Sequence, residues 1–207
     1  MGIISNGTTL LDAGALDSGV ATGSIIHIDT TTCSNVNTVS FTDNLDSTYK
    51  EYIFKFINIH PTGGSGSLSF LFQTNKNSQA SDCAKQSTFF HPYADEGGTD
   101  GEAVLEYATG SDLANNAGEQ RLFQGPADDD NDSGLSGVLH LYDPSNTTSM
   151  KHFLCVLQGA LDVGGSPYTR CGFIEGYVND TAAVDGVQFR FSAGNIGSGL
   201  IKRYGVK

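Results

Sequence analysis

The chain has 207 residues and a formal net charge of −12, with 26 glycines and no tryptophan. A chain of this length fits one large β domain, which buries enough apolar surface to fold without a metal or a disulfide. The 23 acidic against 11 basic side chains disfavour nucleic-acid binding, because contact with phosphates requires clustered basic residues.

Residues 1–22 are rich in Gly, Ser, Thr and Asp and are expected to form an extended N-terminal arm, ahead of a single β-sandwich domain over residues 23–207. The arm is expected to pack on a neighbouring subunit; the alternative is that it folds back along its own domain. Met1–Asn6 has neither the basic nor the apolar region of a secretory signal, and no stretch approaches the roughly 18 apolar residues that span a bilayer. We therefore expect synthesis in a cytoplasm and no membrane partner.

Alternating apolar side chains predict the first strands of the domain at Ser24–Thr31 and Val36–Thr42. The strongest candidate strand is Glu51–His60, where apolar side chains occupy both faces. One face should carry Tyr52, Phe54 and Phe56, and the other Ile53, Ile57 and Ile59. Two apolar faces predict a central strand that is covered on both sides.

The turn Pro61–Gly66 is expected to return the chain into a strand at Leu68–Thr74, which would form a hairpin with Glu51–His60. Asp112–Asn116 is expected to form a single helical turn. The glycine-rich run Gly194–Gly199 is expected to be the tight turn of a last hairpin, since no helix follows it to bind a phosphate. The remaining strands are expected at Gln86–Tyr93, Glu102–Tyr107, Leu135–Tyr142, Met150–Gln158, Thr169–Asn179, Val187–Ser192 and Gly199–Val206.

Ten or eleven short strands without a helical segment of useful length predict an all-β fold. The expected architecture is an antiparallel two-sheet β-sandwich, jelly-roll-like, with the N-terminal arm extending from it.

The four cysteines are widely spaced and form no metal-binding pattern; they are Cys33, Cys83, Cys155 and Cys171. Cys155 and Cys171 lie within apolar strand patterns, which favours buried free thiols. One or two disulfides are the alternative if the protein matures outside the cell.

The five histidines show no metal-ligand spacing, and no motif for a catalytic nucleophile is present. His60 and His91 each precede a proline at a strand position and are expected to be structural. Pairing between their two strands could still bring His140 and His152 close together. We therefore predict no catalytic residue and no enzyme activity.

The most suggestive local feature is an acidic run with carboxylates at every second position, Asp128, Asp130 and Asp132. Oxygen ligands at this spacing suit Ca²⁺, but Leu139 stands where an EF-hand requires a bidentate Glu. A solvated acidic loop is favoured, and a Ca²⁺ site at these three residues is the alternative. The same interpretation applies to the acidic run Asp95–Glu102, and no other cofactor is expected.

Four segments carry a resemblance to a known family: MGIISNGTTLLDAGALDSGV, YKEYIFKFINIHPT, LHLYDPSNTTSMKHF and AVDGVQFRFSAGNIGSGLIKRYGVK. They resemble virion structural proteins of marine tailed bacteriophages (cyanophage-like or pelagiphage-like), of the capsid-decoration or tail-fibre type. The resemblance covers most of the chain and is weakest over Asn75–Asp132. Its motifs are structural, so it implies a particle component and assigns no binding or catalytic residue.

A single domain with an arm and no fibre repeat favours a capsid decoration or cement protein. Such a protein would bind the major capsid protein or other virion proteins as a homo-oligomer, with a trimer expected. The alternative is a tail-fibre or receptor-binding module that recognises host-surface glycans through the acidic loops, with Tyr93 or Tyr107 beside them. A glycan hydrolase is a third interpretation.

Overall fold

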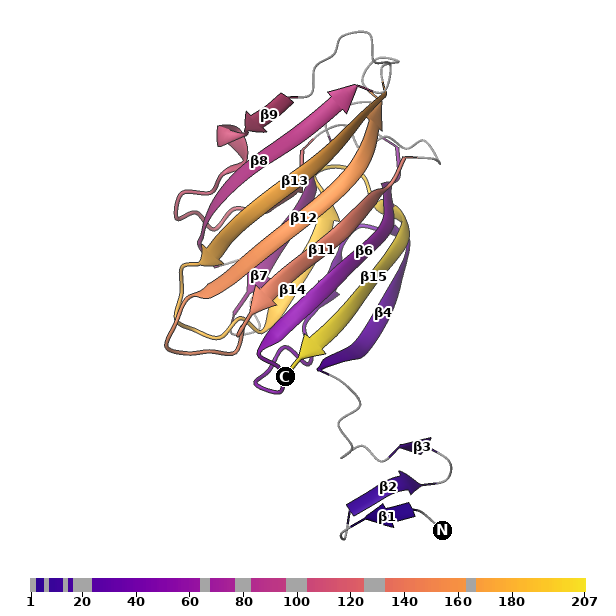
Figure 1. The fold of residues 1–207 in the computed structure, drawn as a ribbon. Coiled ribbons are helices and arrows are strands. Elements are labelled where there is room, and N and C mark those ends of the chain that lie inside the picture. The colour runs from indigo at the N-terminus through magenta and orange to yellow at the C-terminus, as the bar shows by residue number, and fades with distance from the viewer. Residues whose placement is uncertain are drawn as a thin grey trace.

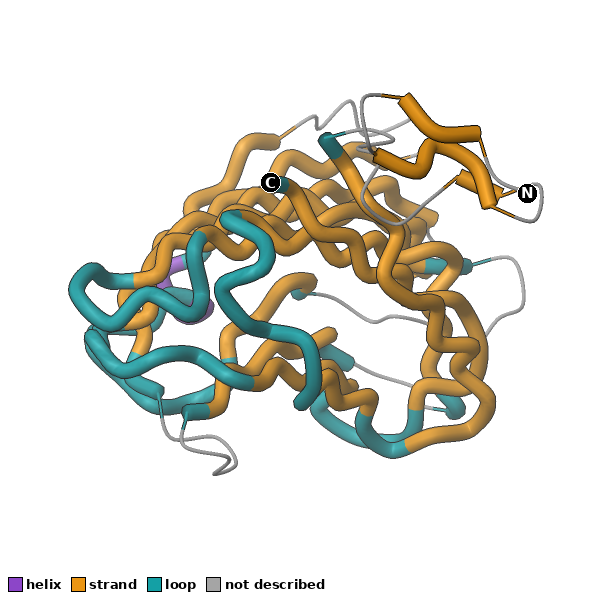
Figure 2. The backbone as a smooth tube through the Cα atoms, turned by 90° about the horizontal axis from the view of Figure 1, so that it is seen from below, coloured by secondary structure: helices purple, strands orange, loops and turns teal. Residues whose placement is uncertain are grey.

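The computed structural model describes residues 3–5, 8–12, 15–16, 24–63, 68–76, 83–95, 104–124, 133–162 and 167–207. Nearly all regular structure in these residues is antiparallel β-strand, and two larger sheets pack face to face (Figures 1 and 2). The prediction of an all-β, two-sheet sandwich is confirmed.

The larger sheet has eight strands. In spatial order they are β4 (Ile25–Val36), β15 (Ile196–Val206), β6 (Glu51–Pro61), β11 (Leu135–Tyr142), β12 (Lys151–Asp162), β13 (Pro167–Val178), β8 (Lys85–Asp95) and β9 (Val104–Tyr107). The smaller sheet has four strands, in the order β10 (Gln120–Phe123), β7 (Phe70–Asn75), β14 (Gly186–Phe191) and β5 (Val39–Phe41).

The strand order is that of a jelly roll. Along the chain, β4, β5, β6 and β7 alternate between the two sheets, and β10, β11, β14 and β15 do so again. The neighbours β4-β15-β6-β11 therefore face β5-β14-β7-β10, which is the double Greek key of this architecture. The other four strands, β12, β13, β8 and β9, extend the larger sheet beyond β11.

Three short strands precede this body: β1 (Ile3–Ser5), β2 (Thr8–Asp12) and β3 (Ala15–Leu16). They pair with one another as a separate antiparallel sheet, and in the described part of the chain they pair with no strand of the larger sheets. The strands of the sandwich itself all lie between Ile25 and Val206. That the arm packs on a neighbouring subunit stays a prediction.

The two predicted hairpins are wrong. β6 and β7 lie in different sheets, and so do β14 and β15, so each turn carries the chain across the sandwich. The reason is packing: the rings of Phe56 and Phe70 meet from opposite sheets at 5.3 Å, so the apolar face of each sheet is covered by the other. The two crossings run together, since Thr62 N donates to Asn195 O at 2.8 Å.

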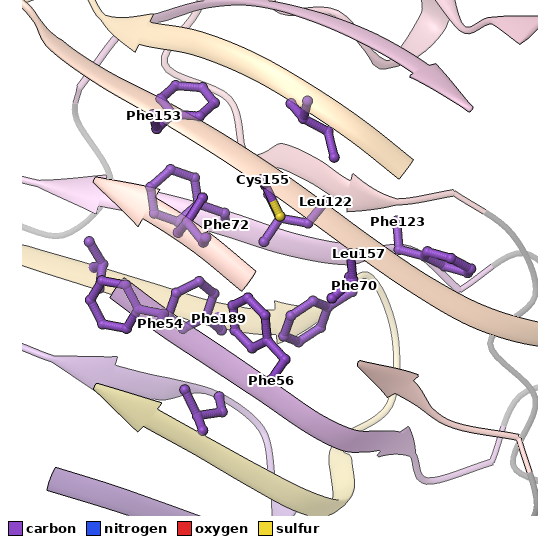
Figure 3. Packing of buried hydrophobic residues seen from close by; sticks show 14 of the residues in the cluster. Phe54, Phe56, Phe70, Phe72, Leu122, Phe123, Phe153, Cys155, Leu157 and Phe189 are labelled. Carbon is purple, nitrogen blue, oxygen red and sulfur yellow. The ribbon is translucent and has the colours of Figure 1, made fainter. Parts of the chain in front are cut away.

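The core between the sheets is aromatic. Phe189 on β14 lies among five other phenylalanine rings, at centroid distances from 5.0 to 6.2 Å, and several of them are labelled in Figure 3. The five are Phe41, Phe54, Phe56, Phe70 and Phe72. Both sheets contribute to this cluster, so it fixes the distance between them.

The predicted facing of β6 holds only for part of the strand. Asn58 has a positive φ of 48°, and the register with both neighbouring strands shifts here, which is a β-bulge. Because the bulge adds one residue, Ile59 turns into the core and is fully buried. The other face of β6 is only partly covered, because Ile53 is buried whereas Lys55 is exposed and Ile57 is 38% exposed.

The helical turn predicted at Asp112–Asn116 is wrong, because these residues form no helix and a 3₁₀ turn lies just before them at Thr109–Ser111. Asp112 is extended, and its carboxylate accepts a hydrogen bond from Phe89 N at 2.8 Å. All four cysteines are free thiols; Cys155 is buried as expected, whereas Cys171 is only half-buried.

Candidate interaction face

The candidate site is the outer face of the eight-stranded sheet, the side turned away from the four-stranded sheet. Strand register aligns its side chains in rows that cross the whole sheet. The central row is Tyr107, Phe90, Phe173, Val156, Val138, Lys55, Lys202 and Thr30, from β9 to β4. Its first five members are apolar, so five adjacent strands present a continuous apolar row to the outside.

Several of these apolar side chains are open to solvent. Phe90 is 39% exposed and Tyr107 is 57% exposed, and Leu105 beside them on β9 is 70% exposed. Phe90 stacks on Phe173 with ring centroids 5.1 Å apart and an interplanar angle of 8°. Contiguous apolar surface of this kind marks an interaction site more often than scattered residues do.

Two lysines continue the central row. Lys55 on β6 and Lys202 on β15 stand directly opposite each other, an arrangement that places like charges side by side and is unfavourable. Lys55 lies over the ring of Tyr204, 5.1 Å from its centroid. Within the described residues neither lysine has a carboxylate partner, although the chain is strongly acidic.

An exposed carboxylate lies in the next row. Glu175 on β13 stands opposite Leu154 and Thr88, and it too lacks an ion-pair partner in the described part of the chain. Two strands separate β13 from β6, and Glu175 stands two residues beyond the central row. At ~4.8 Å per strand and ~3.3 Å per residue, the backbones at Glu175 and Lys55 are about 16 Å apart. These opposite charges cannot meet within one chain.

The outer face of the four-stranded sheet provides a comparison inside the same molecule. It presents polar side chains, including Ser40, Gln188 and Arg190, in register across β5 and β14 and toward β7. Arg190 is paired with Glu119 through two hydrogen bonds. One outer face of the sandwich is therefore suited to water, whereas the larger one is not.

A hollow of about 460 Å³ opens on the outer face where β8, β13, β12 and the end of β11 meet. Aromatic side chains border it, and His152 packs edge-on against Tyr177 with centroids 6.1 Å apart. The full lining is Gln86, Ser87, Thr88, Tyr142, His152, Phe153, Leu154, Glu175, Gly176 and Tyr177. Its size and mixed lining are typical of a small-ligand site.

The tyrosines proposed from the sequence do not share a site. Tyr107 lies on the outer face opposite Phe90. Tyr93 shares a side of β8 with the buried His91, 6.0 Å between centroids, and the Arg170 guanidinium lies over its ring at 5.3 Å. The pKa of His91 is lowered, mainly by burial and then by the charge of Arg170. This environment favours the neutral imidazole expected of a structural histidine.

The predicted metal ligands Asp128, Asp130 and Asp132 lie outside the described residues, as does most of the run Asp95–Glu102. No group of three or more His, Cys, Asp or Glu side chains suited to a metal occurs within the described ranges. His140 stands opposite Leu154, so it is offset by two residues from His152, and its ring contacts the carboxylate of Glu51 instead.

Two other polar clusters are structural. Lys85, Lys151 and Arg203 are fully buried, and each donates to backbone carbonyls of adjoining loops; for Lys151 these are Asp180 and Ala182. Such bonds satisfy the buried cations and fix the loops between the sheets.

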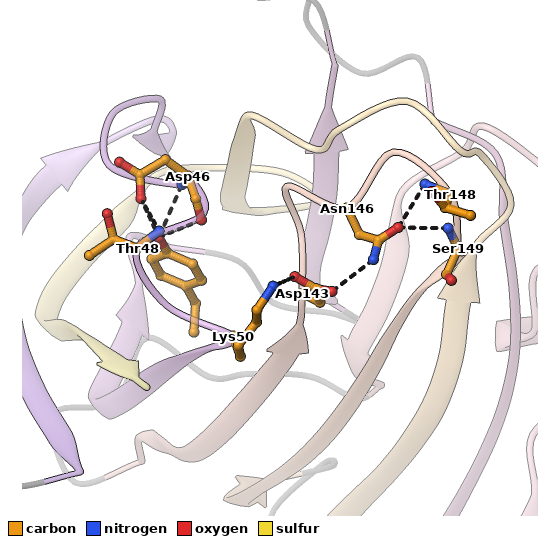
Figure 4. Close-up of polar contacts among 8 residues, drawn as sticks. Asp46, Thr48, Lys50, Asp143, Asn146, Thr148 and Ser149 are labelled. Atoms are coloured by element: carbon orange, nitrogen blue, oxygen red, sulfur yellow. Dashed lines mark hydrogen bonds and ion pairs between the residues drawn. The ribbon is translucent and has the colours of Figure 1, made fainter.

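The second cluster lies in the turns at one end of the sandwich (Figure 4). Asn146 donates to Asp143 at 2.8 Å, and Lys50 lies 3.1 Å from the same carboxylate. These contacts lower the pKa of Asp143, with the Asn146 hydrogen bond as the larger cause. Asp46 Oδ1 accepts from Thr48 N at 2.8 Å, and Asn146 Oδ1 accepts from Thr148 N at 2.7 Å. These last two are the usual bonds of Asx turns, and the whole set shapes loops without forming a site.

No protein-family model, curated protein or solved structure matches the chain. No helix in the described residues is long and apolar enough to cross a membrane.

Proposed function

We propose that the chain is a non-enzymatic structural protein of a bacteriophage particle, a capsid decoration or cement protein that binds the shell as a homotrimer. Its location would be the virion, and its partners would be copies of itself and the major capsid protein or other virion proteins. The observation that supports the proposal is the apolar central row of the outer face, which a protein partner would cover. The jelly-roll fold agrees by analogy, because capsid proteins commonly use it.

The test is the copy number of the protein in purified particles, measured by quantitative mass spectrometry against the major capsid protein. A decoration protein should be present in hundreds of copies per particle. A few dozen copies or fewer would contradict the proposal, since that number fits a tail or fibre component.

A second function is favoured by one observation, the hollow bordered by Tyr142, His152 and Tyr177. In this alternative the protein is a tail-fibre or receptor-binding module, and a host-surface glycan would stack on these rings and bond to Glu175. The two functions exclude each other at this place, because a partner covering Leu154 and Glu175 would close the hollow.

Binding of the isolated protein to whole cells and to a glycan array separates the two. Saturable binding that is lost in Tyr177→Ala but kept in Tyr107→Ala would establish the receptor-binding alternative. The decoration proposal expects no saturable binding in any of the three proteins.

A further inference from the structure

We infer that the outer face is an interface between copies of this chain, in which one half of the face contacts the other half of a second copy. The first half, the β6 half, consists of β4, β15, β6 and β11; the second, the β13 half, consists of β12, β13, β8 and β9. This inference rests on the homo-oligomer in the proposed function and assigns its contact surface.

Charge is the first argument. The β6 half carries the adjacent cations Lys55 and Lys202, and the β13 half carries the exposed Glu175. In the described ranges none of the three has an ion-pair partner, and about 16 Å separates the backbones at Lys55 and Glu175 within one chain. A second copy can bring the two signs together, as complementary interfaces do.

The row geometry allows this contact. A two-fold axis parallel to the strands, between β11 and β12, would place β6 of one copy over β13 of the other and β15 over β8. Lys55 then lies above Phe173 and one row from Glu175, and Lys202 lies above Phe90. Ammonium groups over these rings would gain cation–π attraction in addition to the ion pair. This two-fold contact joins copies in pairs, whereas a closed trimer would join each half of the face to a different copy.

The available area is sufficient. Eight strands at ~4.8 Å spacing and about eight residues of length give a face of roughly 34 by 26 Å. This is close to the ~800 Å² per partner of a standard specific interface. The apolar centre of the face, Val138 and Val156 on the adjacent strands β11 and β12, would be buried in the middle with the charges toward the sides, as interfaces are usually built.

A second copy fits this face better than a different partner of one charge. An acidic partner would be repelled by Glu175, and a basic partner would be repelled by the two lysines. The unpaired charges lie in separate halves by sign, since Glu51 in the β6 half is paired with His140; such a surface is self-complementary, which symmetric contacts require.

The experiment measures molar mass by size-exclusion chromatography with light scattering, over a dilution series of the full chain. The proteins are the wild type, Lys55→Glu, Glu175→Lys and the double variant with both changes. Each single reversal should weaken association by ~10-fold or more, and the double variant should recover most of the loss because the pair is restored with exchanged signs. Arg121→Glu, on the outer face of the smaller sheet, is the matched control and should associate as the wild type does.

A wild type that stays monomeric at all concentrations overturns both the interface and the homo-oligomer of the proposed function. An oligomer that is unaffected by both reversals, or whose loss is not recovered in the double variant, overturns the interface alone. Circular dichroism and thermal unfolding verify that every variant is folded.

Discussion

Phe189 is the residue whose packing most directly joins the two sheets. Five phenylalanine rings from both sheets surround it within 6.2 Å, and the side chain is fully buried. Phe189→Ala should lower the free energy of unfolding by ~3–5 kcal/mol, because the surrounding rings cannot close the cavity. Urea unfolding measures the change.

Phe90→Ala is the control for the loss of an aromatic ring. Phe90 is 39% exposed on the outer face of a monomer, so at high dilution its removal should cost well under half as much. Equal losses in the two variants would show that Phe189 has no special part in holding the sheets together.

Lys85 gives a prediction for the pH dependence of stability. Burial lowers its pKa from 10.5 to about 8 in the folded protein. Between these two values the unfolded chain binds more protons than the folded chain, so this group makes the free energy of unfolding rise with pH. Between about pH 7.5 and 9.5 the gain should be on the order of 2 kcal/mol.

Comparison with Lys85→Met isolates this contribution. Buried thiols act in the opposite direction: the pKa of Cys155 is raised by burial, so its contribution is present below the unfolded thiol pKa and is lost as pH rises above it. That effect is common to both proteins and cancels in the difference. The stability of the Met variant relative to the wild type should fall as pH rises, and a difference that stays constant with pH would contradict the assigned pKa.

At the scale of elements, the bulge on β6 determines which side chains reach the core. Gly199 on β15 lies across from it with φ of 120°, and an added Cβ would come within 2.5 Å of the Asn58 carbonyl oxygen. Gly199→Ala should therefore destabilise the fold by ~2 kcal/mol or more. Asn58→Gly should be neutral within ~0.5 kcal/mol, because glycine adopts a positive φ without strain. Thermal unfolding of both variants tests the pair, and a tolerated alanine at Gly199 would exclude strain at this bulge.

Element positions could largely be predicted from the sequence, because alternation of side chains is a local signal. Glu51–His60 and Leu135–Tyr142 agree with β6 and β11 to within a residue. The strand β10 was missed because four residues are too few for a pattern and Leu122 and Phe123 are both buried in succession. The turn after β6 is rich in glycine and proline, and such a turn can either form a hairpin or cross between two sheets. Only the tertiary packing decides between these two paths.

The candidate face could not be predicted in the same way. Its central row collects one side chain from each of eight strands that are distant in the sequence, so it exists only once strand order and register are known. Phe90 and Phe173 each alternate with core residues, and nothing local tells which of the two sides of a strand faces outward. The positive pair Lys55 and Lys202 is likewise a product of register.

At the scale of the whole molecule, the two outer faces of the sandwich have different roles. The smaller sheet presents paired or polar groups such as Arg190 to water, whereas the larger sheet presents its apolar row and the unpaired charges. The extension β12-β13-β8-β9 contributes four of the five apolar members of that row. We therefore interpret the extension as the part of the fold that adds an association surface to a jelly roll.

This interpretation predicts that stability depends on protein concentration. Association that involves only folded copies stabilises them by mass action. The midpoint of thermal unfolding should therefore rise by about 2 °C or more for each tenfold increase in concentration, given the entropy of unfolding of a chain of this size. In the variant Phe90→Ser with Phe173→Ser the midpoint should become independent of concentration, because the two stacked rings of the central row are removed while the core is left intact. Salt at about 1 M should weaken the concentration dependence of the wild-type midpoint only partly, since it screens the charges and not the apolar contact. A wild-type midpoint that does not vary with concentration would contradict the interpretation that the extension adds an association surface.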